Sequence, residues 1–423
     1  MKEKSQNYDV VIIGGGPAGL MAAVTAGERG RRVLVLEKNE ILGKKLLISG
    51  GGRCNMTNAN PNHRDFVSQY GKKGNFLYTP FSIFGVPETI EFFNKNGVPT
   101  KVENNFRVFP QSDKSADVLN TLLNLAKKYK VEFKIGAEVT GLKKLKGKIT
   151  AVKLKSGEEI SAESFILATG GKSHPETGST GDGFTWLEKI GHKVISQAPI
   201  LVPIKIKESW ISDLAGIAVD KAGISVWRAE NQAGQEIWQK DFSKVGRFLF
   251  THVGLTGPTI LNMSRQVGDL LEYGEVKIAI DFYPGVGLDE MHKMLLSTFE
   301  ANLNKKVKNL VFKEVPTKVY EIILRQLEID GEWVVNELLR EMRLALVEKF
   351  KRFEMTVSGL LGEDKAIVTS GGVDLGEVDF KTMRSKLFSN LYLVGDILDF
   401  DRPSGGFSLQ ICWTTGYVAG RSA

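Results

Sequence analysis

The fold of this chain is decided by Asp9-Val10-Val11-Ile12-Ile13-Gly14-Gly15-Gly16-Pro17-Ala18-Gly19, an apolar segment that breaks into glycines. Its four apolar residues are typical of a strand buried on both faces. Gly14, Gly16 and Gly19 have the spacing G-x-G-x-x-G, which permits a tight turn, close approach of a pyrophosphate, and packing of helix against strand. The amides of the following helix then face the phosphates. The stretch therefore predicts a dinucleotide-binding βα turn.

The next predicted strand, Arg32–Leu36, ends in Glu37, about 20 residues after the glycines, where a carboxylate accepts hydrogen bonds from a ribose. An ordinary tight βα turn is the alternative interpretation. The order of strand, glycines, helix, strand and acid is more specific than the glycines alone. Because FMN lacks the adenosine ribose and the pyrophosphate, this pattern favours a dinucleotide.

Length and composition limit the class of protein. A chain of 423 residues is expected to form two or three domains. The net charge is +7, and its basic surplus lies in the first 194 residues, where it suits an anionic dinucleotide or simply solvated lysines. No basic stretch is interleaved with aromatic residues, so we do not expect a nucleic-acid partner.

Cysteine content and hydropathy bear on the compartment. The two cysteines, Cys54 and Cys412, lie far apart in the sequence, which argues against a disulfide framework and favours a reducing compartment. The N-terminal residues contain no signal-peptide core, and no apolar run approaches transmembrane length. We therefore expect a cytoplasmic protein that does not associate with membranes.

Glycine breaks recur after other predicted strands. They occur at Gly50–Gly52, at Gly170–Gly171, at Gly395 and at Gly405–Gly406, which precedes a helix that begins at Phe407. In a doubly wound sheet the carboxyl ends of the strands converge, so all of these breaks are expected to line one extended ligand.

FAD suits this ligand site better than NAD. The triple-glycine loop accommodates a bulky ring, with Lys44, Lys45 and Arg53 supplying positive charge, and Asp396 reaches the ribityl chain. The positive end of the last helix then faces the ring. Cys54, next to the loop, is either redox-active or a small buried filler.

The predicted fold class is α/β, a Rossmann-like FAD-binding domain interrupted by an inserted domain that is β-rich and then helical. The boundaries are 1–194 for the first part of the FAD domain, 195–345 for the insert and 346–423 for the second part. The insert changes from alternating strands to predicted helices at 288–303, 306–313, 317–328 and 333–342. We expect it to cover the reactive face of the flavin.

Several motifs together resemble one family, the BaiN-like and aminoacetone-oxidase-like FAD-binding proteins, which are also called NAD(FAD)-utilising dehydrogenases. The resemblance extends over nearly the whole chain and implies the two-part FAD domain. The motifs that carry it are Lys45–Asn58, Arg107–Pro110, Thr177–Gly183, Leu249–Pro258, Thr369–Val373 and Gly395–Gln410.

The chain departs from the family pattern at a few positions. It has Gly405-Gly406-Phe407-Ser408 where Gly-Gly-Tyr-Asn is usual, Asp401-Arg402-Pro403 just before, and Cys412 where small or aromatic residues are common.

The predicted cofactor-binding residues belong to the glycine breaks and the strand ends beside them. They are Gly14, Gly16, Pro17, Ala18, Gly19, Glu37, Lys38, Lys44, Lys45, Ser49, Gly50, Gly51, Gly52, Arg53, Cys54, Asn55, Glu138, Val139, Ala168, Thr169, Gly170, Gly171, Gly371, Gly395, Asp396, Gly405, Gly406, Phe407 and Ser408. No metal site is predicted.

Two residues are candidates for catalysis. His252 follows a predicted strand and precedes a Gly-Leu-Thr-Gly-Pro turn, where Pro258 suits the first position of a helix. A histidine titrates near neutral pH, so His252 is either an acid/base or a structural hydrogen-bonding residue. Arg402 is either a clamp for a substrate carboxylate or a partner for a flavin phosphate or a surface acid.

Three functions remain open at this point. The preferred one is an FAD-dependent oxidoreductase that takes hydride from NAD(P)H and reduces an activated double bond in a small molecule. The second is an amine oxidase of the aminoacetone type that passes electrons to O₂. The third is a flavin-containing protein that associates with RNA or acts as a sensor. The sequence names neither the substrate nor the oligomeric state.

Overall fold

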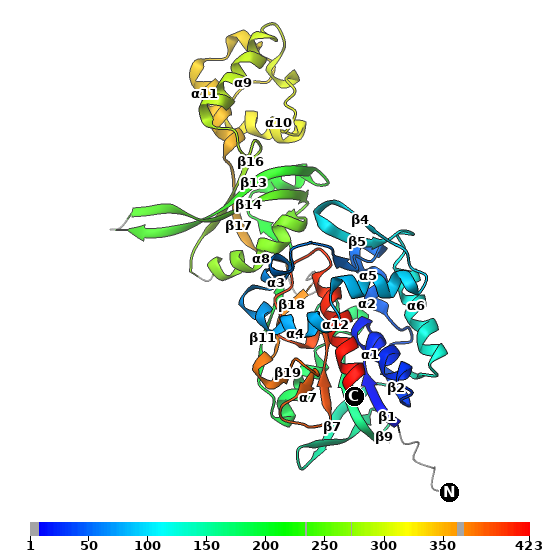
Figure 1. Ribbon diagram of the computed structural model, residues 1–423. Helices are drawn as coiled ribbons and strands as arrows, with labels where there is room; N and C mark the ends of the chain where they lie inside the picture. The colour runs from blue at the N-terminus through cyan, green and yellow to red at the C-terminus, as the bar shows by residue number, and fades with distance from the viewer. Residues whose placement is uncertain (1–7, 233–234, 272, 362–367) are drawn as a thin grey trace. The chain divides into compact units, whose positions relative to one another are not determined.

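The computed structural model describes residues 8–232, 235–271, 273–361 and 368–423 (Figure 1). The chain forms two compact units, Met1–Pro199 with Ala366–Ala423 and Ile200–Lys365, which are described separately below.

Unit 1 is built on a seven-stranded sheet with the order β19-β20-β21-β10-β1-β2-β6. The strands from β21 to β6 are all parallel, whereas β20 pairs antiparallel with both of its neighbours. The central strand β1 is almost wholly buried, as its apolar run predicts. The bounds of these strands are β1 Tyr8–Ile13, β2 Val33–Glu37, β6 Glu132–Ile135, β10 Ala162–Leu167, β19 Val378–Asp379, β20 Arg384–Ser385 and β21 Leu391–Leu393.

Three smaller sheets complete the strands of unit 1. Their orders are β3-β5-β4, β7-β8-β9 and β11-β18. The bounds are β3 Thr57–Asn58, β4 Thr100–Val102, β5 Arg107–Pro110, β7 Val139–Leu145, β8 Lys148–Leu154, β9 Glu159–Ile160, β11 Val194–Ile200 and β18 Val368–Val373. The helices of this unit are α1 Pro17–Glu28, α2 Lys44–Ile48, α3 His63–Ser68, α4 Tyr78–Ile83, α5 Val86–Lys95, α6 Ser115–Lys128, α7 Asp182–Ile190 and α12 Phe407–Ser422.

The first and last helices of unit 1, α1 and α12, pack closely together (Figure 1). A Cβ at Gly416 would lie 2.4 Å from the carbonyl oxygen of Ala18, and one at Gly420 would lie 2.4 Å from that of Ala22. Only glycine permits this backbone approach, so the C-terminal segment is held directly against the helix that follows the glycine turn.

Unit 2 contains a closed six-stranded barrel with the order β12-β15-β14-β13-β16-β17. Every pairing is antiparallel, and β13 and β14 form a long hairpin. The strands are β12 Ile204–Ile206, β13 Ala218–Gln232, β14 Gln235–Thr251, β15 Gly254–Thr256, β16 Val276–Asp281 and β17 Phe353–Leu360. Apolar side chains from both the barrel and its helices form a single core that is distinct from the core of unit 1.

The helices of unit 2 are α8 Pro258–Leu271, α9 Leu288–Glu300, α10 Thr317–Gln326 and α11 Arg340–Lys351. Helix α8 begins at Pro258, which confirms the predicted start. The predicted helices at 306–313 and 333–342 are wrong. Short 3₁₀ turns form at Val307–Asn309 and Val335–Glu337, and only the last three residues of the second range lie in a helix, the start of α11. These two segments pair through backbone bonds instead, with Val307 N–H donating to the carbonyl of Trp333 at 2.8 Å.

The boundaries of the compact units fall at 199/200 and 365/366, compared with the predicted 194/195 and 345/346. The larger difference arises because the second half of α11 and the whole of β17 follow residue 345 and belong to unit 2. There β17 pairs with both β12 and β16 and so closes the barrel. In the part of the chain that the structure describes, no helix has the length and apolar character needed to cross a membrane.

Candidate dinucleotide site

The glycine turn after β1 has the geometry that its spacing predicts. Gly14 has a φ of 107°, and a Cβ there would lie 2.5 Å from the carbonyl oxygen of Ala168 on the neighbouring strand end. A Cβ at Gly19 would lie 1.9 Å from the carbonyl oxygen of Gly14. At Gly16, by contrast, a Cβ would meet no atom within 4 Å, because this glycine faces a cavity. Gly14 and Gly19 therefore allow close backbone packing, whereas Gly16 leaves room in the cavity for a ligand.

Glu37 is buried at the end of β2, where its carboxylate organises the turn. Oε2 accepts a hydrogen bond from Gly15 N–H at 2.8 Å. Oε1 accepts from the backbone N–H of Asn39 at 2.8 Å and from its side-chain Nδ2 at 2.7 Å. A carboxylate has about four lone-pair positions, so one remains for the ribose hydroxyl that the sequence predicts as its partner.

A cavity with about 890 Å³ of empty space, part of it open to solvent, lies beside this turn. It brings together residues from strand ends that are far apart in the sequence, as expected for a doubly wound sheet. The predicted cofactor-binding residues that line it are Gly14, Gly16, Pro17, Ala18, Glu37, Lys38, Lys44, Lys45, Val139, Ala168, Thr169, Gly170, Gly395 and Asp396.

Sequence reasoning missed another set of lining residues. Asn39, Gly43, Ala137 and Val394 adjoin predicted positions, and Thr177–Thr180 with Asp182 come from the glycine-rich segment that was noted only as a family motif. Trp186 on α7 also lines the cavity, and no local signal marks it. Cys412 on α12, which the sequence marked only as a departure from the family pattern, lines the cavity as well.

The three lysines of the cavity wall are all engaged by nearby oxygens. Lys38 Nζ donates to Thr180 Oγ1 at 2.6 Å and to Asp182 Oδ2 at 2.8 Å. Lys44 Nζ donates to the carbonyl of Glu176 at 2.6 Å, and Lys45 Nζ donates to that of Ser173 at 2.7 Å. Burial lowers the pKa of the Lys45 ammonium, and the negative charge of Asp396 opposes this effect.

Asp396, which also lines the cavity, is held by residues of the C-terminal segment. Its Oδ1 accepts a hydrogen bond from Ser408 Oγ at 3.1 Å and lies 3.5 Å from Arg402 Nε. Burial raises the pKa of the Cys412 thiol, whose Sγ lies 4.0 Å from the same oxygen. Cys412 is therefore a protonated thiol at neutral pH.

Arg402 is one of the largest fully buried side chains and does not line the cavity. Its Nη2 donates to the carbonyl of Leu398 at 2.6 Å, while Nε and Nη1 lack a hydrogen-bond partner among the described residues. Its contacts in unit 1 are thus with the segment that carries Asp396. The carboxylate clamp suggested by the sequence stays a prediction.

The triple-glycine loop lies outside the lining of the cavity. Gly50, Gly51 and Gly52 all have left-handed φ values, of 58°, 69° and 85°. The sequence predicted that Arg53 supplies positive charge to the ligand. In the structure its guanidinium instead binds the carboxylates of Glu103 and Asp113 and lies 4.1 Å from the centre of the Phe109 ring.

Cys54, at the end of the same loop, is fully buried, and burial raises the pKa of its thiol to about 12. These facts favour the buried filler over the redox-active thiol. The other predicted cofactor residues that do not line the cavity are Gly19, Ser49, Asn55, Glu138, Gly171, Gly371, Gly405, Gly406, Phe407 and Ser408.

The cavity wall fits a bound dinucleotide in one further respect. Thr169 lines the cavity, and its buried Oγ1 has no hydrogen-bond partner in the described part of the chain. Such a group is costly unless a ligand or water satisfies it. No group of three or more His, Cys, Asp or Glu side chains suited to a metal occurs among the described residues.

His252 lies in unit 2, in the two-residue turn between β14 and β15. Its side chain is exposed. The backbone of the following strand packs closely against β12, because a Cβ at Gly254 would lie 2.0 Å from the carbonyl oxygen of Ile204. The predicted position at a strand end is confirmed, whereas its catalytic role stays a prediction.

A parallel sheet with this glycine turn, an acid at the end of β2 and a cavity at the strand ends defines a Rossmann-type dinucleotide-binding protein. The family model described as the HI0933-like protein Rossmann domain matches residues 8–422. The chain belongs to this family of FAD-binding proteins, also known as the BaiN family, and is an FAD-dependent oxidoreductase. The resemblance inferred from the motifs and the predicted fold class are both confirmed.

Two kinds of curated relative match almost the full chain. A 3-dehydro-bile acid delta(4,6)-reductase of Clostridium scindens is 32% identical, with 97% of this chain and 98% of the relative covered. A ribosomal RNA dihydrouridine synthase of Escherichia coli is 29% identical, with 98% and 97% covered.

Solved structures share the fold at low identity. The open conformation of a flavocytochrome c3 fumarate reductase aligns with a TM-score of 0.55 and 15% identity over 99% of this chain and 78% of that one. The 3-ketosteroid-delta4-(5alpha)-dehydrogenase of Rhodococcus jostii RHA1 aligns with a TM-score of 0.53 and 14% identity, covering 100% and 98%.

Proposed function

We propose that this protein is an FAD-dependent reductase of a carbon–carbon double bond conjugated to a carbonyl in a small molecule, with NAD(P)H as the electron donor. The observation that carries the proposal is the near-complete match to a bile acid delta(4,6)-reductase, together with the match to enzymes that convert uridine into dihydrouridine. Both kinds of relative are named for the reduction of a ring double bond. The oxidase alternative has no such support.

The cavity of unit 1 is the proposed FAD site. The backbone at Gly14 and Gly16 and the start of α1 would hold the pyrophosphate, and Glu37 would hold a ribose hydroxyl. Thr169 Oγ1 and Asp396 would bind further hydroxyl groups. FAD supplies the hydride chemistry, and the protein supplies binding, orientation and any proton.

Reduction of a conjugated double bond also needs a proton for the second carbon, and His252 is the proposed donor. Two facts support it: the side chain is exposed, and it sits at a strand end. Histidine is also the side chain that most often transfers a proton to or from a reacting group. A purely structural role has less support, because the residue lies in a solvent-exposed turn.

The test is an anaerobic reaction in two halves. NADH or NADPH is mixed with the yellow protein, and flavin bleaching is followed; a cyclic enone is then added, and recovery of the oxidised spectrum is measured. The proposal expects fast bleaching and enone-dependent recovery. Bleaching by a primary amine instead, with peroxide formed in air, would overturn it in favour of the oxidase.

A second candidate substrate is a uridine of ribosomal RNA, favoured by the named activity of the relatives from Escherichia coli and Haemophilus influenzae. Recovery of the oxidised spectrum by an unmodified rRNA transcript, with no recovery by enones, would select this candidate. RNA binding would in addition weaken steeply with salt.

A further inference from the structure

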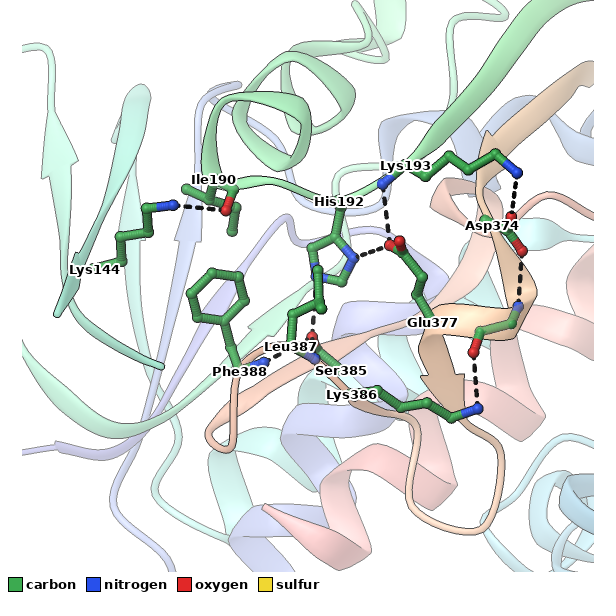
Figure 2. A network of polar contacts seen from close by, with 11 residues as sticks. Lys144, Ile190, His192, Lys193, Asp374, Glu377, Ser385, Lys386, Leu387 and Phe388 are labelled. Atoms are coloured by element: carbon green, nitrogen blue, oxygen red, sulfur yellow. Dashed lines mark hydrogen bonds and ion pairs between the residues drawn. The ribbon is translucent and has the colours of Figure 1, made fainter. Parts of the chain in front are cut away.

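The chain connects the two units twice, and each connection adjoins a strand of unit 1. It leaves along β11 and returns along β18, and these strands form a two-stranded sheet. The residues just before β11 and just after β18 are joined by a network of polar contacts, shown in Figure 2. The network therefore adds side-chain contacts to the strand pairing that already joins these two parts of the chain.

His192 is the centre of the network, and its side chain is fully buried. Nδ1 lies 2.6 Å from Glu377 Oε2, and Nε2 lies 3.0 Å from Ser385 Oγ (Figure 2). The imidazole thus joins the segment before β11 to two segments that follow β18. Glu377 Oε2 also accepts the backbone N–H of Lys193 at 3.0 Å, which ties the same two stretches a second time.

The hydrogen bonds around Ser385 determine where the protons of His192 lie. Ser385 Oγ accepts the backbone N–H groups of Leu387 at 3.0 Å and Phe388 at 3.1 Å. With both lone pairs used, its hydroxyl hydrogen is free only to donate, and Nε2 is the acceptor within reach. Nδ1 then carries the single ring proton and donates it to Glu377. The network is complete only with neutral His192.

Charged side chains near the His192 ring come from each of the segments that pack around it. Glu377 faces Nδ1 directly. Lys193 Nζ binds Asp374 Oδ2 at 2.9 Å, and Lys386 Nζ donates to the carbonyl of Gly376 at 2.7 Å, so both lysines are engaged elsewhere. Lys144 on β7 donates to the carbonyl of Ile190 and lies 5.8 Å from the ring centre of Phe388, which packs against His192.

We propose that His192, Glu377 and Ser385 form a proton-sensitive clamp, which joins the residues before β11 to those after β18. The clamp is closed, with both imidazole hydrogen bonds made, when His192 is neutral, and it opens when His192 is protonated. A second proton on Nε2 would point at a hydroxyl oxygen whose lone pairs are already used. The Ser385 side chain would have to turn away, releasing the N–H groups of Leu387 and Phe388.

The direction of the pH effect follows from burial. Burial lowers the pKa of His192 below its ordinary value of 6.5, while Glu377 partly opposes this. The unfolded or opened chain therefore binds the proton more readily than the closed clamp does. The clamp is fully stable above pH 6.5 and weakens as the pH falls below that value.

Amide hydrogen exchange of the FAD-loaded protein at pH 7.5 and 5.5, corrected for the intrinsic rates, tests the clamp. We expect residues 191–195 and 374–388 to lose protection at pH 5.5, while β1 and β10 keep theirs. In His192→Phe these segments should be equally protected at the two pH values. His174→Phe is the matched control, because His174 forms the same kind of pair with Glu176 at 2.8 Å but is only partly buried. It should keep the wild-type pH response.

Unchanged protection of the wild-type segments at pH 5.5 would overturn the proposal, as would a His192→Phe protein that still loses protection there. If His192→Phe fails to fold, the ¹⁵N shifts of the His192 ring in the wild type decide the matter. A neutral ring protonated on Nδ1 at pH 7.5 supports the clamp, and a doubly protonated ring or the other tautomer refutes it.

Discussion

Gly16 offers a direct test of where the cofactor lies, because its two partners in the glycine motif respond differently to a side chain. Gly16 has φ −81° and ψ −175°, which valine adopts without strain, and a Cβ there meets no atom within 4 Å. Gly16→Val should therefore fold. Its cost to the free energy of unfolding is about 1 kcal/mol, since valine is a poor residue at a helix N-cap.

The cost for FAD binding is larger. Methyl groups at Gly16 would fill part of the cavity, an overpacking term of about 1–3 kcal/mol, and would displace charge-assisted hydrogen bonds worth about 1.5–3 kcal/mol. Together these give about 2.5–6 kcal/mol, or roughly a 10²- to 10⁴-fold weaker Kd. Apoprotein prepared by removal of FAD is titrated with FAD by flavin fluorescence, and unfolding is followed by circular dichroism.

Two variants complete the experiment. Gly141→Val places the same side chain in open space on β7, away from the cavity, and should keep both FAD affinity and stability. Gly19→Ala puts its Cβ against the backbone of Gly14 and should unfold more easily before FAD is added. Parent-level FAD affinity in Gly16→Val would refute the placement of the pyrophosphate.

Three further predictions follow from the site. Glu37→Gln should weaken FAD binding and lower the free energy of unfolding by about 1–3 kcal/mol, because an amide NH₂ would face a buried N–H donor; chemical denaturation with and without FAD measures both. His252→Ala should keep full FAD content and normal reduction by dithionite but lose about 10²–10⁴-fold in turnover, and turnover at the parent rate would remove the residue from the mechanism. Cys54, with a pKa of about 12, should resist iodoacetamide at pH 8 in the folded protein and react only after denaturation, as peptide mass spectrometry would show.

The cofactor unit was largely predictable because backbone sterics dictate its sequence. A turn with φ near 107° and a helix packed within contact distance of a carbonyl demand glycine at Gly14 and Gly19, so the motif is visible without any structure. The same is true of Pro258, which marks the start of α8. At such positions the residue type alone predicts the local backbone geometry.

Side-chain partners were less predictable, because they depend on which distant segments the fold brings together. Arg53 follows a glycine-rich loop and was expected to face an anion, yet Glu103 and Asp113 neutralise it. Trp186 lines the cavity from the middle of α7, where no local pattern marks it. No residue near His192 indicates that Glu377 and Ser385 will meet it.

The end of the insert was placed too early for a topological reason that applies to any inserted barrel. Unit 2 enters through β12 and closes through β17, and these two strands pair, with Ile204 opposite Leu360. In unit 1 the flanking strands β11 and β18 also pair. An insertion interrupts its host with least disturbance when its two ends are adjacent, so the last strand of the insert must return beside the first. A helical stretch such as α9–α11 is therefore expected to be followed by one more strand before the host fold resumes.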